Sequence, residues 1–280
     1  MTERATRNGA SSPSTSNSLW LFFVLVFCWT WSFWIVAAIS GTSSQTPFGT
    51  TLILLGLLGP MLGGIGFAWF RQSRESWLDY WSRILDPKRV RPGWYLIIVA
   101  FVPGLMALAV LLDVVSGGSN ALALIREKTT PFLSAPSTIV PFVLGIFIMG
   151  PLPEELGWRG YALDQLQARW NALASSLILG VLWALWHLPL FFIRDTYHYS
   201  QGAWSAWFWL FMVQVVSMAI ILTWIFNNTR RSTLAAILFH FMANLAYALA
   251  NLTVRTNLYS TLVWIVVAIA IVASWVPRVR

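Results

Sequence analysis

The sequence has little charge and almost no cysteine. Charged residues make up 10% of its 280 residues and hydrophobic residues 58%, and the mean hydropathy is +0.68. Soluble globular chains carry about 25% charged residues, so the composition excludes an ordinary soluble protein. Cys28 is the only cysteine, which excludes a disulfide framework and a cysteine metal cluster.

Apolar runs long enough to cross about 30 Å of hydrocarbon recur along the chain and leave no room for a separate soluble domain. We therefore predict an all-α fold, a polytopic membrane helix bundle with about eight transmembrane helices. Such a protein is integral and multi-pass, in the plasma (inner) membrane if the source is bacterial. The predicted spans are Leu19–Ile39, Thr51–Phe70, Trp94–Val115, Ile139–Pro153 and beyond, Ala172–Ile193, Trp204–Phe226, Thr233–Ala250 and Leu258–Val276.

The first seventeen residues are small and polar, and we predict a disordered cytoplasmic tail over residues 1–17. The apolar run that follows is too long and too rich in tryptophan for a cleaved signal peptide, so it is predicted to be retained as a span. Residues 18–280 are then one transmembrane domain.

The positions of Lys and Arg predict the orientation, because loops rich in these residues stay in the cytoplasm. With eight spans, the side that holds both termini collects 14 of them and the other side collects 4. Both termini are therefore predicted to be cytoplasmic. The net charge of +8 then reflects this bias and attraction to anionic lipid headgroups, with no nucleic acid as a partner.

A few polar residues fall inside the apolar runs, although an ionisable group at membrane depth costs roughly 2.5 kcal/mol or more. A single histidine inside a span often does no more than form a hydrogen bond between helices. Four ionisable groups on three helices instead indicate a functional site that faces a cavity. The four ionisable residues are Glu154, Glu155, His187 and His240; Asn244 shares the helical face of His240, and Asp113 near a span end is a lesser candidate.

The two neighbouring glutamates are predicted to differ. Glu155 and Arg159 stand at i,i+4 with Glu first, the favoured order for a helical ion pair. Glu154 points about 100° away and has no partner on its own helix, so it is free for chemistry. Counting residues from the turn near Trp170 places Glu154 and His187 at one depth. The same count leaves His240 about 10 Å shallower, unless residues 160–170 lie flat at the membrane interface.

Three short motifs resemble those of the CAAX prenyl protease type II family, also known as CPBP or Abi intramembrane proteases. "EELGWR" resembles its EExxxR motif, "WALWH" its FxxxH motif and "HFMAN" its HxxxN/D motif, in the family's order. The match covers about residues 139–250, which we take as the protease core. One departure is Trp183, where the family usually has Phe; the change leaves the pocket wall aromatic.

This resemblance implies hydrolysis of a peptide bond inside the membrane, in a cavity accessible from the cytoplasm, with a peptide or membrane protein as substrate. By motif position, Glu154 and His187 would activate the water, and His240 and Asn244 would stabilise the oxyanion. Glu155 and Arg159 would be the supporting pair.

Alternatives remain at this point. A zinc-dependent protease would use Glu154, His187 and His240 as ligands, but HExxH is absent and Asn244 is a poor zinc ligand. We therefore predict a mechanism with no cofactor. A non-catalytic immunity or scaffold protein would retain the fold without the activity. A proton-coupled transporter would use the intramembrane charges, but the hydropathy pattern has no internal repeat.

Overall fold

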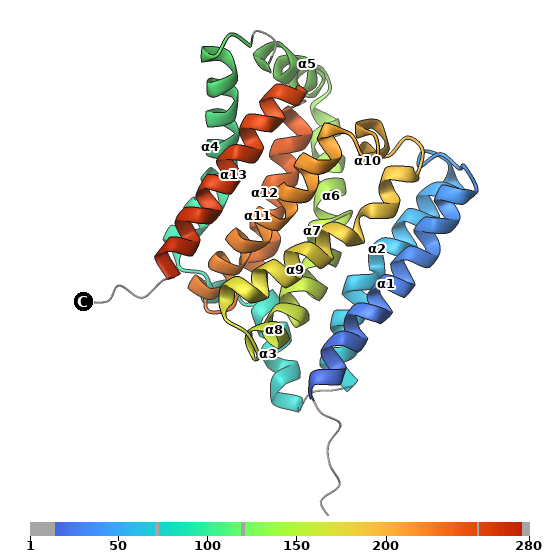
Figure 1. Ribbon diagram of the computed structural model, residues 1–280, viewed down its shortest axis with the longest axis vertical. Helices are drawn as coiled ribbons and strands as arrows, with labels where there is room; N and C mark the ends of the chain where they lie inside the picture. The colour runs from blue at the N-terminus through green and yellow to red at the C-terminus, as the bar shows by residue number, and fades with distance from the viewer. Residues whose placement is uncertain (1–14, 71–72, 119–120, 251, 276–280) are drawn as a thin grey trace, which may run out of the picture.

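The computed structural model describes residues 15–70, 73–118, 121–250 and 252–275, which form helices and no β-strand (Figure 1). A π-helix over Trp158–Ala162 lies within the fourth span, and a 3₁₀ helix over Leu188–Phe192 ends the fifth. The α-helices are α1 (Thr15–Ile39), α2 (Pro47–Phe70), α3 (Arg74–Leu85), α4 (Pro92–Val115), α5 (Ala121–Ser134), α6 (Ile139–Ile148), α7 (Pro151–Gly157), α8 (Leu163–Gln167), α9 (Ala172–Trp186), α10 (Tyr197–Gln201), α11 (Ala206–Asn228), α12 (Thr233–Ala250) and α13 (Val254–Trp275).

Eight helical stretches are long and apolar enough to cross a membrane, and they confirm the predicted all-helical, multi-pass fold. Their bounds differ from the predicted ones by only a few residues, apart from the fourth, which runs over Pro136–Gln167. Helix α1 begins at Thr15, inside the range predicted as a disordered tail. The rest of that predicted tail, residues 1–14, lies outside the described residues.

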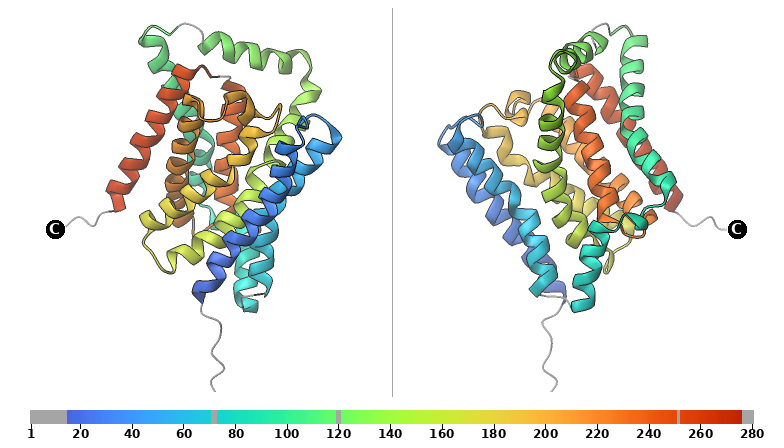
Figure 2. Two further views of the ribbon diagram at one scale, coloured as in Figure 1. Left: turned by 45° about the vertical axis from the view of Figure 1, so that its right-hand side comes forward. Right: turned by 180° about the vertical axis from the view of Figure 1, so that it is seen from behind.

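The spans alternate in direction, so α1 begins on the side of the bundle where α13 ends. We call this the terminus side. The opposite, or far, side carries the α1–α2 connection, α5 and α10, at the top of the view in Figure 1. Figure 2 shows α5 lying across the far-side end of the bundle. The short helices α3, α5 and α10 were not predicted, because none is apolar enough to resemble a span.

The fourth span is broken near its middle. Helix α6 ends at Ile148, and α7 restarts with Pro151 in its first turn, where the missing proline N–H costs no hydrogen bond. After Gly157 the helix widens into the π-helix before continuing as α8. Such π-segments are frequent at functional sites, and this one directly follows Glu154 and Glu155.

Two glycines bring α7 into close contact with α2. A side chain on Gly64 would collide with the Leu156 carbonyl, and one on Gly157 would collide with Pro60. Small residues permit this backbone approach between membrane helices. The close contact fixes α7, and with it both glutamates, against the rest of the bundle.

Candidate active site

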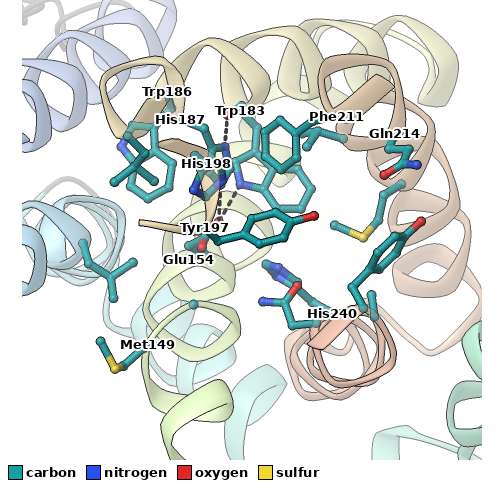
Figure 3. Close-up of a pocket in the computed structure, with 18 of the residues that line it drawn as sticks. Met149, Glu154, Trp183, Trp186, His187, Tyr197, His198, Phe211, Gln214 and His240 are labelled. Carbon is teal, nitrogen blue, oxygen red and sulfur yellow. Dashed lines mark hydrogen bonds and ion pairs between the residues drawn. The ribbon is translucent and has the colours of Figure 1, made fainter. Parts of the chain in front are cut away.

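The predicted site residues gather around one cavity of about 380 Å³. Its wall is mainly apolar and aromatic, which is typical of small-ligand and peptide sites. Helices α7, α9 and α12 bring the polar groups to it, as Figure 3 shows for most of them. Those polar groups are Glu154, His187, His240 and Asn244, with Trp183 beside them.

Glu154 faces this cavity and is 5% exposed. Its Oε2 accepts a hydrogen bond of 2.6 Å from the indole N–H of Trp183. The Nε2 of His187 lies 3.9 Å from the same oxygen. Among the described residues, no Lys or Arg forms an ion pair with Glu154. The carboxylate is therefore held by a neutral donor and faces a base across a short gap.

His187 follows the last residue of α9 and turns its ring into the cavity. Its Nδ1 lies 2.8 Å from the carbonyl oxygen of Trp183. A carbonyl only accepts hydrogen bonds, so Nδ1 carries the proton and Nε2 is left with a lone pair in the neutral ring. That lone pair is the one on the Glu154 side. Trp183 thus contacts both groups, through its indole and its backbone.

Glu155 points away from the cavity and confirms the predicted ion pair. Its Oε1 accepts from Arg159 Nη1 at 2.8 Å, and both side chains are fully buried. The same oxygen lies 2.9 Å from Nδ1 of His240 on α12. Arg159 also places its guanidinium 4.6 Å from the centre of the Trp183 ring. The pair therefore orients His240 as well as holding α7 in place.

Asn244 lies one turn after His240 on α12 and lines the same cavity. A methyl group built on Gly150 would be 3.1 Å from Asn244 Nδ2 and 3.6 Å from Glu154 Oε1. The amide and the carboxylate therefore converge on one small space beside the break between α6 and α7. Gly150 leaves that space open.

The depth predictions have mixed outcomes. Glu154 and His187 do lie at one level, as their close approach shows. The expected 10 Å offset of His240 is wrong, because its ring contacts Glu155 and lies 5.1 Å from that of Trp183. The count assumed straight, upright α-helices. In the structure a π-helix and a short α8 separate α7 from the turn near Trp170.

Two features of the site were missed from the sequence. The hydrogen bond from Trp183 to Glu154 requires an indole, whereas the sequence suggested only an aromatic wall. His198 was not among the predicted site residues, yet it lies on α10 and lines the cavity, with its ring 5.6 Å from that of His187. Burial lowers the pKa of His198 to about 4, so this imidazole is neutral at pH 7. Because His198 lies in a connecting segment, no hydropathy pattern marked it as a site residue.

Asp113 lies outside the cavity. Its carboxylate is 3.1 Å from Arg255 Nε and accepts a hydrogen bond of 2.8 Å from Thr256. These contacts join the far-side ends of α4 and α13. Asp113, the lesser candidate predicted from the sequence, thus has a structural role between these two helices.

The zinc alternative would require Glu154, His187 and His240 to converge on one point. Among the residues that the structure describes, no three His, Cys, Asp or Glu side chains are arranged to hold one metal ion. Glu154 Oε2 and His187 Nε2 lie 3.9 Å apart, and His240 keeps its Nε2 free because its Nδ1 is the atom engaged with Glu155. A catalytic zinc site needs three protein ligands converging at about 2 Å from one point.

Comparisons with known proteins identify the family of this chain. Residues 136–246 match the family described as type II CAAX prenyl endopeptidase, Rce1-like. The chain is also 31% identical, over 254 residues, to CAAX prenyl protease 2 of Methanococcus maripaludis. That alignment covers 90% of this chain and 92% of the archaeal protein. The chain therefore belongs to the family of type II CAAX prenyl endopeptidases and is a membrane-embedded enzyme of that family.

Proposed function

We propose that this enzyme cleaves a peptide bond within the membrane by means of a water molecule activated by Glu154 and His187. The observation that carries the proposal is the gap of 3.9 Å between Glu154 Oε2 and His187 Nε2. The gap is too long for a direct hydrogen bond. It suits a water molecule that donates one hydrogen bond to each acceptor. Attack by this water on the scissile carbonyl carbon transfers its proton to Glu154.

His240 and Asn244 stabilise the negative oxygen that develops on the carbonyl. For this role Nε2 of His240 has to donate, and since Nδ1 already donates to Glu155, the ring acts as an imidazolium. Glu155 supplies the opposite charge. Asn244 Nδ2 supplies a second donor. Fixed donors at such an oxyanion typically contribute about 10²–10³ in kcat each.

The second half of the reaction returns the proton. Glu154, now protonated, donates to the nitrogen of the leaving amine as the C–N bond breaks, which regenerates the carboxylate. Trp183 holds Oε2 in place throughout, because its N–H donates to that oxygen. The products are a new C-terminal carboxylate and a new amine.

The proposed mechanism requires no metal, and the position of Asn244 supports this. A zinc site would gain more from a histidine or a carboxylate at that position than from an amide. Elemental analysis of active, purified protein is the test, and we expect no stoichiometric zinc. About one zinc per chain, with activity lost on stripping and restored by zinc alone, would replace this proposal with a metalloprotease.

The substrate is most directly found in cells. Membranes from cells that express the wild-type protein and the Glu154→Gln variant are compared by peptide-level proteomics. We expect at least one fragment that is present with the wild type and missing with the variant at equal expression. Identical fragment patterns, with a folded variant, would contradict the proposed protease activity.

A further inference from the structure

Two expectations from the sequence can both hold only if the cavity opens on the terminus side of the bundle. The distribution of Lys and Arg places the termini in the cytoplasm, whereas the family resemblance implies a cavity that opens to the cytoplasm. The structure tests whether the two lie on the same side, because it gives the position of the cavity relative to the terminus side of the bundle.

The cavity lies in the far-side half of the bundle. Leu57 lines it from the first half of α2 and Gln214 from the first half of α11, and both helices begin on the far side. Tyr247 lines it from the last turns of α12, which ends there. The catalytic residues Glu154 and His240 form its floor near mid-height. The active site is thus nearer to α10 than to either described end of the chain.

The exposed residues of the cavity wall also indicate access from the far side. Tyr197 on α10 is 54% exposed and Met149 at the α6–α7 break is 50% exposed. Tyr197 belongs to a far-side connection, and Met149 faces outward between helices. The cavity is therefore reached from the far-side interface and from the adjacent lipid.

The terminus-side half is packed below the cavity floor. Trp158, Tyr161 and Leu163 lie on the π-helix and at the start of α8 and are at most 2% exposed. The rings of Trp158 and Tyr161 pack against Phe22 of α1. Below them, Asp164 pairs with Arg83 and with Arg231, and Arg83 also donates to the Gly160 carbonyl. A polar hollow on this face includes Asp164 and Arg231 but shares no lining residue with the cavity.

The excess of Lys and Arg on the terminus side is also present in the structure. Arg159 is fully buried inside a span, so it no longer counts as a loop residue. Among the described residues, the terminus side still holds twice as many basic residues as the far side. The terminus-side residues are Arg74, Arg83, Lys88, Arg89, Arg91, Arg169, Arg230 and Arg231, and the far-side ones are Arg126, Lys128, Arg194 and Arg255.

We propose that the active-site cavity opens on the non-cytoplasmic side of the membrane. The substrate is then an exported or membrane-anchored polypeptide whose apolar segment enters the cavity from the outer interface. A cytoplasmic protein tail would have to cross the packed terminus-side half to reach Glu154. The assignment of a substrate rests on the proposed protease function, whereas the side on which the cavity opens does not.

Cysteine labelling tests the orientation without any need for activity. Cys28 is replaced by Ser, and one cysteine is introduced at Gln45 on the far side or at Glu75 on the terminus side, both exposed positions. In intact spheroplasts, a membrane-impermeant maleimide is expected to label Gln45→Cys. It is expected to label Glu75→Cys only after lysis or in everted vesicles. The reverse pattern, or labelling of both in sealed spheroplasts, would overturn the proposal.

A second arm connects the orientation to cleavage. In the same background, Tyr197→Cys places a thiol at the cavity mouth, and Glu75→Cys serves as the matched control. Impermeant maleimide added to intact spheroplasts is expected to stop formation of the Glu154-dependent fragment in Tyr197→Cys alone. Continued cleavage by fully labelled Tyr197→Cys protein would contradict access through this mouth. If no such fragment exists, the protease function fails while the labelling result stands.

Discussion

Glu154 and Glu155 are neighbours in the sequence but lie on different faces of α7, where their surroundings differ. On the packed face, Glu155 is fully buried and shares one oxygen between Arg159 and His240. On the cavity face, Glu154 has a neutral indole donor and an imidazole 3.9 Å away. Removing one partner of a buried ion pair is costly, whereas a carboxylate without a close counter-charge is available to take up a proton. In the proposed mechanism, a difference of one position in the sequence thus separates a structural residue from a reactive one.

The largest effect on stability is expected on the packed face. Glu155→Gln leaves Arg159 buried without its counter-charge, and breaking a buried pair typically costs roughly 3–5 kcal/mol. We expect a clear drop in melting temperature in detergent and loss of activity with it. Arg159→Ala should behave similarly. An unchanged melting temperature in both variants would show that the pair does not support the fold.

On the cavity face, Asn244→Ala is expected to spare the fold and slow the reaction. Loss of one oxyanion donor should lower kcat by about 10²–10³ with little change in KM, since the donor acts mainly in the transition state. Steady-state kinetics on a cleavable peptide give both constants. A rise in KM with kcat unchanged would instead assign Asn244 to substrate binding.

A smaller effect is expected for Trp183→Phe, which keeps an aromatic ring but removes the N–H donated to Glu154. A hydrogen bond to a charged group contributes about 1.5–3 kcal/mol, so kcat should fall about 10- to 100-fold. KM should stay near that of the wild type, and the melting temperature should fall as well, because a buried hydrogen bond and part of a buried ring are lost. Wild-type kcat in Trp183→Phe would show that the indole N–H has no part in positioning Glu154.

The smallest effect is expected for Asp113→Asn, a buried acid far from the cavity. Its partner Arg255 is 45% exposed and can be hydrated when the pair is lost. We expect a stability loss of about 1 kcal/mol or less and no change in kcat. A large fall in kcat with an unchanged melting temperature would mean that Asp113 acts in the reaction.

The fold was largely predictable because span length and apolarity are local properties of the sequence. The pairing of Glu155 with Arg159 was predictable for the same reason, since both lie on one helix. The contact between His240 and Glu155 was not, because it depends on how α12 packs against α7 and on the π-helix that shifts the register. His198 escaped notice because α10 reaches the cavity from a connecting segment, without any hydropathy signal.

The contrast between the two glutamates is tested most directly by measuring the cleavage rate and the melting temperature of Glu154→Gln in one preparation, beside the wild type. The account predicts that cleavage is abolished while the melting temperature stays at the wild-type value. Activity within about tenfold of wild type, a change of only about 1.4 kcal/mol in the barrier, would contradict the assignment of Glu154 as the base. Loss of activity together with a collapse in melting temperature would place Glu154 among the structural residues with Glu155.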